Sequence, residues 1–304
     1  MKRVAILNWA GHLNFGDQLF IDGLQSLFKK LEITVFTDAP NKLYPQVDFK
    51  QINKHELFVL GGGELINEDR LFIPPTWSNK IKIPKIILGC GVNAKSSAQL
   101  SSNVIKELRN FSYIGLRDQS AVDILSNIPE ISSKVDLFYD LAYSINIPRI
   151  PSEPLPNTAI VIPTDRFSNQ ADLGILEHNI AETSKSWLKN NLSPFDNAMF
   201  LPFGVEDNND WETCNALSSC AANSTIIPHN MLNTYYVCSL ITNASHVFPY
   251  RLHGLILSHI LGTPYTFYPY HQKLARVHAT ITTKSPAMIK QTQKDKLEVL
   301  LKIV

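Results

Sequence analysis

RVAILNW (3–9) is a short apolar run closed by polar residues, and LFIDGLQSLFKKL (19–31) and ITVFT (33–37) follow it along the chain. The apolar residues of 19–31 recur at three- and four-residue spacing, which predicts a helix, whereas the two flanking runs are typical of buried strands. A strand, a helix and a second strand in this order form the unit from which a parallel sheet is built. The start of the chain therefore predicts an α/β fold.

The same alternation continues through both halves of the chain. In the first half it gives strands at 56–66, 82–92 and 111–118, with 134–145 ending the unit, and in the second half strands at 158–164, 197–204, 224–228 and from 246. Between the halves, INIPRIPSEPLPNT (145–158) contains four prolines, which suits an extended linker. Since the chain has 304 residues and a domain typically has ~150, we predict two Rossmann-like domains, 1–148 and 149–304.

Ligands of such sheets bind beyond the carboxyl ends of the strands. We therefore expect the glycine-rich strand ends of the two domains to face a shared cleft. The last segment, AMIKQTQKDKLEVLLKIV (287–304), has an apolar stripe at helical spacing, formed by Leu297, Leu300, Leu301 and Val304. We expect this segment to be a helix of the second domain that packs back across the domains.

The charge balance argues against a large charged partner. Lys and Arg total 28 and Asp and Glu total 27, so no net field attracts nucleic acid or an anionic membrane, and we expect a small ligand. The four cysteines form no CxxC pair or zinc-like cluster, which favours free thiols and a reducing compartment. Since we find no signal-peptide pattern and no run of ~20 apolar residues, we predict a cytoplasmic protein, with its oligomeric state undetermined.

The first candidate for ligand binding is the turn Asn14-Phe15-Gly16-Asp17, between the first strand and the first helix. Gly16 allows a tight turn, and the amides that open the following helix favour an anion. Asp17 has two interpretations, because aspartate is both a preferred helix cap and a carboxylate able to bind a hydroxyl.

The second candidate is Gly61-Gly62-Gly63-Glu64, directly after an apolar strand. Three consecutive glycines are costly in chain entropy, and they make sense where the backbone must approach a ligand closely. A wide turn is the alternative, but one glycine suffices for that. The run lacks the further glycine of the GxGxxG dinucleotide fingerprint, so a nicotinamide cofactor is not expected.

Two arginines also follow predicted strands. Arg117-Asp118 is either a surface ion pair or, at the carboxyl end of a strand, a group that binds carboxylate or phosphate. In Arg251-Leu252-His253-Gly254, a cation, a titratable imidazole and a helix N-terminus converge. Arg251 and His253, two residues apart, lie on the same side if the backbone is still extended, and Gly254 permits an unusual backbone angle where the helix begins. This segment predicts an anion site with a proton carrier beside it.

In order along the chain, these segments resemble the polysaccharide pyruvyl transferase family. The matching segments are NFGDQ (14–18), VLGGGELI (59–66), ILGCGV (87–92), IGLRDQSA (114–121), YDLAYSI (139–145), FLPFGVED (200–207) and RLHGLILSHILGTPY (251–265). The resemblance implies a fold similar to that of GT-B glycosyltransferases. It also implies transfer of a pyruvyl group from phosphoenolpyruvate to two hydroxyls of a sugar, giving a cyclic ketal in surface polysaccharide biosynthesis.

The resemblance further implies where the site lies. The matching residues are Arg117, Arg251, His253 and Lys273, with Asp17 and the glycine loop nearby. Two residues before the lysine, the family's aspartate is replaced by His271 in this chain. We expect the second domain, through Arg251, Leu252, Gly254 and Lys273, to bind the donor together with Arg117. The first domain, through Asn14, Gly16 and the glycine loop, then serves the acceptor.

As a mechanism, Arg117 and Arg251 each hold one anionic group of phosphoenolpyruvate and His253 moves protons. Asp17 or Glu64 orients or deprotonates the acceptor hydroxyl. The acceptor is a sugar, an oligosaccharide or a lipid-linked saccharide, the last at the inner membrane face. No metal and no cofactor besides phosphoenolpyruvate as co-substrate is expected.

Two other functions remain as alternatives. A GT-B-type glycosyltransferase using a nucleotide sugar would need an acidic ribose ligand, for which Glu206 and Asp207 are candidates. A non-catalytic sugar-binding module would depend on aromatic stacking, for which Tyr250, Tyr265, Tyr268 and Tyr270 are available.

Overall fold

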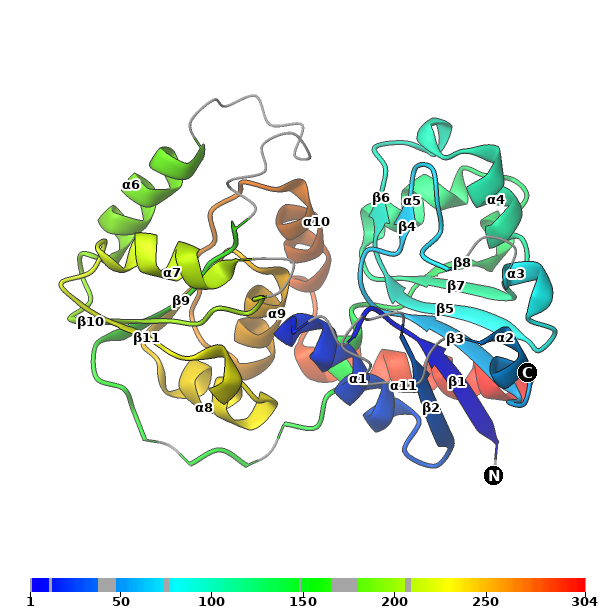
Figure 1. The fold of residues 1–304 in the computed structure, drawn as a ribbon, viewed down its shortest axis with the longest axis horizontal. Helices are drawn as coiled ribbons and strands as arrows, with labels where there is room; N and C mark the ends of the chain where they lie inside the picture. Colours follow the sequence, from blue (N-terminus) through cyan, green and yellow to red (C-terminus); the bar gives the residue numbers. More distant parts are fainter. Residues whose placement is uncertain are drawn as a thin grey trace. The chain divides into compact units, whose positions relative to one another are not determined.

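The computed structural model describes residues 2–10, 13–37, 48–73, 77–147, 149–151, 153–165, 180–205 and 209–303. The chain folds into two compact units. The first contains Met1–Gly11, Asp17–Asn146 and Ala279–Val304, and the second contains His12–Gly16 and Ile147–His278. Figure 1 traces the chain from its blue N-terminus to its red C-terminus, and each unit has a sheet of its own.

The first unit is built on a six-stranded parallel sheet with the order β2-β1-β3-β5-β7-β8. Its strands are β1 (Arg3–Leu7), β2 (Glu32–Phe36), β3 (Leu57–Gly61), β5 (Lys85–Cys90), β7 (Tyr113–Leu116) and β8 (Val135–Leu137), and β4 (Ile66–Asn67) and β6 (Val92–Asn93) form a separate pair. Its helices are α1 (Phe15–Leu27), which begins in the second unit, α2 (Phe49–Ile52), α3 (Trp77–Lys80), α4 (Ser102–Leu108), α5 (Gln119–Ser126) and α11 (Pro286–Ile303). Strand order reverses between β1 and β3, which marks the ligand-binding point of doubly wound sheets.

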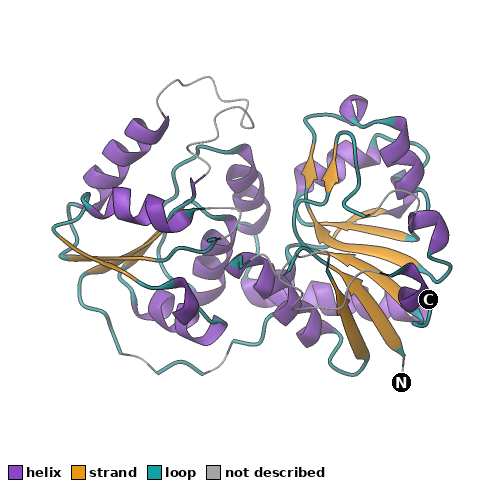
Figure 2. Cartoon of the chain, viewed as in Figure 1, coloured by secondary structure: helices purple, strands orange, loops and turns teal. Residues whose placement is uncertain are grey.

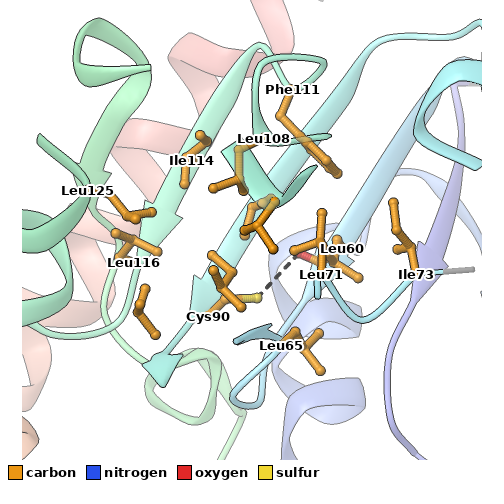
Figure 3. Packing of buried hydrophobic residues seen from close by; sticks show 14 of the residues in the cluster. Leu60, Leu65, Leu71, Ile73, Cys90, Leu108, Phe111, Ile114, Leu116 and Leu125 are labelled. Atoms are coloured by element: carbon orange, nitrogen blue, oxygen red, sulfur yellow. Dashed lines mark hydrogen bonds between the residues drawn. The ribbon is translucent and has the colours of Figure 1, made fainter. Parts of the chain in front are cut away.

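Side chains of this sheet alternate between two buried cores, because successive strand residues point to opposite faces. On one face, Val4 and Ile6 join a cluster that includes Phe20 of α1 and Leu297 of α11. On the other face, Ala5 and Leu7 belong to the cluster of α4 and α5. Figure 3 shows part of this second cluster, in which Leu108, Ile114 and Leu125 belong to the same group of buried side chains as Cys90 of β5. A sheet covered on both faces explains why its strands read as nearly continuous apolar runs.

The second unit has a four-stranded parallel sheet with the order β11-β10-β9-β12. Its strands are β9 (Thr158–Ile162), β10 (Asn197–Phe200), β11 (Asn223–Ile226) and β12 (His246–Pro249). Its helices are α6 (Ile180–Leu192), α7 (Asp210–Ser218), α8 (Thr234–Asn243), α9 (Leu252–Leu261) and α10 (Gln272–Ile281). The last three residues of α10 belong to the first unit. Leu188 of α6 and Leu217 of α7 pack with Val161 on one face of the sheet. Helix α9 contacts both β12 and α8. In Figure 2 this sheet, like that of the first unit, is flanked by helices.

The predicted α/β fold with parallel sheets is confirmed, and the long middle segment of the first unit ends at Asn146. The C-terminal segment Ala279–Val304, which we placed with 149–278, groups with the first unit. Helix α11 is held there by specific bonds, because Gln293 donates to the carbonyls of Phe138 and Asp140 and Lys296 pairs with Asp136 at 2.6 Å. No helix in the described ranges is long and apolar enough to cross a membrane.

Candidate functional site

In the second unit, strand order reverses between β9 and β12, and charged residues follow both strands. Asp165 follows β9, and Arg251 follows β12 directly before α9. The carboxyl ends of neighbouring parallel strands on either side of such a reversal form the usual ligand-binding crevice of this fold. The strand-to-helix turn predicted from RLHG therefore lies where a ligand of this sheet would bind.

Two acidic residues surround the guanidinium of Arg251. Its Nε donates to Oδ2 of Asp210 at 3.0 Å, its Nη2 donates to Oδ1 of the same carboxylate, and Asp165 lies 3.5 Å from Nη2. The side chain of Arg251 is 12% exposed and that of Asp210 is fully buried. Burial alone would lower the pKa of Arg251, but the interactions with Asp210, Tyr270 and Asp165 together outweigh burial and raise it. Arg251 is thus a permanent cation, and with two carboxylates the group has a formal charge of −1.

His253 lies in the first turn of α9, against Gly16. A Cβ atom added to Gly16 would stand 2.1 Å from Nδ1 of His253, far inside van der Waals contact. The expected extended arrangement of Arg251 and His253 is wrong, because α9 begins at Leu252 and Arg251 alone has an extended backbone, with φ −93° and ψ 138°. The absence of a side chain at Gly16 is what allows the imidazole to occupy its place.

The turn that contains Gly16 is bound to the second unit by its backbone. Asn14 forms an antiparallel bridge with Gly204, and the amide of Phe15 donates to the carbonyl of Phe203 at 2.7 Å. The rings of Phe15 and Phe203 lie 4.6 Å apart. We placed this turn in the N-terminal domain, but it groups with the second unit, and its service to the acceptor stays a prediction. The physical reason for this grouping is the backbone bonding to the end of β10.

The helix that follows this turn is capped by Asn14 and not by Asp17. The side-chain oxygen of Asn14 accepts a hydrogen bond from the amide of Gly16 at 3.0 Å. Asp17 lies in the first turn of α1, is buried, and belongs to the first unit. Of the two interpretations of Asp17, the capping one is therefore excluded, although a carboxylate in the first turn still favours the helix dipole.

Gly254 and Leu252 serve packing. Gly254 lies inside α9 and is not among the glycines with positive φ, so the predicted unusual backbone angle is wrong. A Cβ atom at this position would meet Cδ1 of Ile162 at 2.7 Å, which means that the glycine allows α9 to pack closely on β9. The Leu252 side chain is buried, so any contact it makes with an anion must come from its backbone amide.

Lys273 lies in the first turn of α10, and its backbone amide donates to Nδ1 of His271 at 3.0 Å. His271 thus occupies a helix-capping position, a role for which aspartate is among the preferred residues. Since Nδ1 accepts this bond, the neutral ring carries its proton on Nε2. The change from the family's aspartate to His271 therefore keeps a capping acceptor beside Lys273.

In the first unit, Arg117 follows β7 and is 1% exposed, which excludes the surface ion pair. Its Nη2 lies 3.4 Å from Glu64, the residue after the glycine loop, and its Nη1 lies 3.9 Å from Asp140. Next to it, Asp118 caps α5 by accepting from the amide of Ala121. Burial raises the pKa of the neighbouring Cys90 thiol to about 12, so this thiol is neutral.

The glycine loop has the strained backbone that only glycine adopts readily. Gly62 and Gly63 have φ values of 75° and 72°. At Gly62 a Cβ atom would also meet the ring of Phe20 at 2.4 Å. Gly91 also lies close to Arg117, because a Cβ atom added at Gly91 would stand 2.5 Å from Nη2 of Arg117. The loop and Arg117 therefore lie together at the carboxyl ends of β3, β5 and β7.

Sequence reasoning named Glu64, which lies beside Arg117, but missed Asp140 there, and it missed both Asp210 and Asp165 beside Arg251. Asp210 resembles a helix cap in the sequence, Asp165 follows an ordinary strand, and Asp140 lies in a segment with no charge pattern. Of the aromatic residues considered for stacking, Tyr250 is fully buried, and its carbonyl accepts a hydrogen bond from the hydroxyl of the half-buried Tyr270. Glu206 and Asp207 lie outside the described residues. Among the described residues, no three His, Cys, Asp or Glu side chains gather as a metal site requires.

Two parallel-sheet α/β units, each with charged residues at its strand ends, define the class of fold. The sequence profile of the polysaccharide pyruvyl transferase family matches residues 14–272. The chain therefore belongs to the polysaccharide pyruvyl transferase family, a family of transferases. No curated protein matches the chain significantly.

Solved structures with a similar fold are distant in sequence. A UDP-GlcNAc 2-epimerase from Methanocaldococcus jannaschii, in complex with UDP-GlcNAc and UDP, has a TM-score of 0.56 and 10% identity, with 99% of each chain covered. The UDP-GlcNAc 2-epimerase from Neisseria meningitidis bound to UDP-GlcNAc has a TM-score of 0.54 and 12% identity, covering 99% of this chain and 100% of that one. A functionally uncharacterised Klebsiella pneumoniae protein has 16% identity and a TM-score of 0.50, covering 91% and 87%. At these identities the likeness concerns the fold, which is GT-B-like.

Proposed function

We propose that this chain transfers the pyruvyl group of phosphoenolpyruvate to two hydroxyls of one sugar residue, forming a cyclic ketal during the synthesis of a surface polysaccharide. Family membership supports the type of transfer. The observation that carries the proposal is the position of His253, which is in contact with Gly16 and follows Arg251 at the end of β12. A proton carrier and a cation at one strand end suit an anionic donor whose reaction moves protons.

The chemistry requires two proton transfers and no net water. The methylene carbon of phosphoenolpyruvate takes a proton, and a first hydroxyl oxygen bonds to the central carbon as it loses its own. A second hydroxyl of the same sugar then replaces the phosphate, which leaves with the remaining proton. An imidazole can both accept and donate a proton, which suits it to both steps, and we assign this role to His253.

We assign donor binding to Arg251, with Lys273 as a second cation of the same unit. Arg117, beside the glycine loop, is the corresponding cation of the first unit, and its part in donor binding remains a prediction. Asp17 or Glu64 is proposed to orient the acceptor hydroxyl. We place the reaction in the cytoplasm or at the inner membrane face, in keeping with four free and buried cysteines.

The direct test is incubation with phosphoenolpyruvate and a panel of sugars, oligosaccharides and lipid-linked saccharides. We expect inorganic phosphate to appear only when donor and acceptor are both present. The acceptor should gain the mass of pyruvate less one water. A parallel incubation with UDP-sugars tests the glycosyltransferase alternative. Consumption of a UDP-sugar without phosphoenolpyruvate, or no phosphate release with any acceptor, would contradict the proposal.

A further inference from the structure

Asp210, the first residue of α7, is a fully buried carboxylate to which the proposed reaction gives no step. Burying a charge is costly unless the charge is paired and hydrogen-bonded. Asp210 meets both conditions, since it accepts from the amides of Gly204 at 2.8 Å and Asp165 at 3.1 Å as well as from Nε and Nη2 of Arg251. Because four hydrogen-bond donors converge on this one carboxylate, the fold holds the side chain of Asp210 in a defined position.

Capping of α7 does not explain this position. The N-cap of α7 is Asn209, whose side-chain oxygen accepts from the amide of Glu212 at 3.2 Å. The donors to Asp210 come instead from the ends of three strands, namely β9 through Asp165, β10 through Gly204 and β12 through Arg251. Asp210 therefore joins the strand ends that form the ligand-binding edge of this sheet.

The hydrogen bonds to Asp210 and Asp165 also determine which edge of the Arg251 guanidinium can face a ligand. A guanidinium has five N–H donors in a rigid plane. Asp210 and Asp165 occupy the edge formed by Nε and Nη2. The contacts with Asp210 and Asp165 involve Nε and Nη2 of Arg251 and do not involve its Nη1. Because the plane is rigid, holding one edge orients the other.

The same carboxylate is linked to the turn that contacts His253. Gly204, whose amide donates to Asp210, forms the antiparallel bridge with Asn14. Two residues after Asn14, Gly16 contacts the imidazole of His253. Both candidate groups of the second unit, Arg251 and His253, are thus connected to Asp210 through one network.

We propose that Asp210 is a positioning residue that fixes the guanidinium of Arg251 in one orientation for an anionic donor. The identity of that donor, phosphoenolpyruvate, rests on the proposed function. Asp210 does not touch the donor itself, since two anions repel.

The test compares Asp210→Asn with Glu212→Gln, which removes the same charge from an exposed position of the same helix. We expect Asp210→Asn to raise the KM for phosphoenolpyruvate by roughly tenfold or more, with a smaller fall in kcat, because a misplaced binding group is costly. Glu212→Gln should behave as the wild type. In an Arg251→Gln background, Asp210→Asn should add little, since the two act as one unit.

A merely structural Asp210 gives a different result. In that case Asp210→Asn lowers the fraction of active protein and leaves the KM for phosphoenolpyruvate unchanged, or its effect on activity adds fully to that of Arg251→Gln. Either outcome overturns the proposal. If Asp210→Asn does not fold, Asp165→Asn provides the same test with a weaker contact, and an unchanged KM in that variant also overturns it.

A second readout does not depend on the reaction. Phenylglyoxal labels accessible guanidinium groups, and mass spectrometry of the peptide containing Arg251 measures the rate. We expect Asp210→Asn to increase labelling of Arg251 several-fold and Glu212→Gln to leave it unchanged. Equal labelling in all three proteins overturns the positioning role. If the wild type uses no phosphoenolpyruvate while Arg251 labelling does increase, the proposed function alone fails.

Discussion

Gly16 and His253 are in contact, with the imidazole occupying the space in which any larger residue at position 16 would place its Cβ, 2.1 Å from Nδ1. The two residues are far apart in the sequence, in the NFGD turn and the RLHG segment. Their contact joins two motifs that the sequence presents separately. It also makes Gly16 a sensitive point for testing the role of His253.

The first prediction concerns Gly16→Ala. The added methyl group requires His253 to move, and displacement of a catalytic group by about 1 Å costs on the order of 10²-fold in rate. We expect turnover to fall by about that factor, measured as phosphate release from phosphoenolpyruvate. Gln25→Ala, at an exposed position of α1, is the control and should retain wild-type turnover. Full turnover by Gly16→Ala would show that the imidazole need not lie where it does.

The second prediction concerns Gly91→Ala in the first unit. Its Cβ would meet the Arg117 guanidinium at 2.5 Å, and Arg117, buried beside Glu64 and Asp140, has little room to withdraw. Overpacking of this kind costs about 1–3 kcal/mol. We expect a lower urea midpoint for Gly91→Ala, with an unchanged slope. A midpoint equal to that of the wild type would mean that the side chain of Arg117 is free to rearrange.

The third prediction concerns Gln293, which anchors α11. Its buried amide donates to the carbonyls of Phe138 and Asp140 and accepts from Ser144. Gln293→Leu leaves these groups without a partner, at a cost of about 1–3 kcal/mol for each unsatisfied group. We expect the free energy of unfolding to fall by about 2–5 kcal/mol. Gln291→Leu, on the exposed face, should change it by less than about 0.5 kcal/mol. Similar values for the two variants would contradict the anchoring role.

The fourth prediction concerns pH. In the second unit, burial lowers the pKa of His229, His246, His259 and His278 below the ordinary value. Below the unfolded pKa of about 6.5 the unfolded chain therefore binds more protons than the folded one, so stability must fall as the pH drops through that value.

Urea midpoints measured between pH about 8 and pH about 5.5 test this prediction. The midpoint should stay level above pH about 7 and fall below it. His246→Gln removes one of the four groups and should make the fall shallower. A midpoint that is constant or rises as the pH drops from 7 to 5.5 would contradict the assignment.

Much of the fold could be predicted because hydrophobic periodicity is a local property. The runs at 3–9 and 246–249 were recognisable as strands, and the helix after Arg251 followed from the apolar run that begins at Leu252. Position 254 shows the limit of this reasoning. A glycine indicates only that space or backbone freedom is needed, and the close packing on Ile162 was visible only in the structure.

Long-range pairing could not be predicted. The apolar stripe that includes Leu297 shows that the C-terminal helix needs a partner, but its bonds to Asp136 and Asp140 depend on the complete fold. In the same way, a single sequence does not show which of 27 acidic residues neutralises Arg251. Asp210 fills that role from a position that locally resembles an ordinary helix start.

The central claim is that His253 carries protons for pyruvyl transfer, and one comparison tests it most directly. Phosphate release and phosphoenolpyruvate binding are measured together for the wild type and for His253→Ala. We expect turnover to fall by roughly 10²–10⁴-fold while the dissociation constant for phosphoenolpyruvate stays within a few-fold of the wild-type value. Near-normal turnover by His253→Ala would contradict the account.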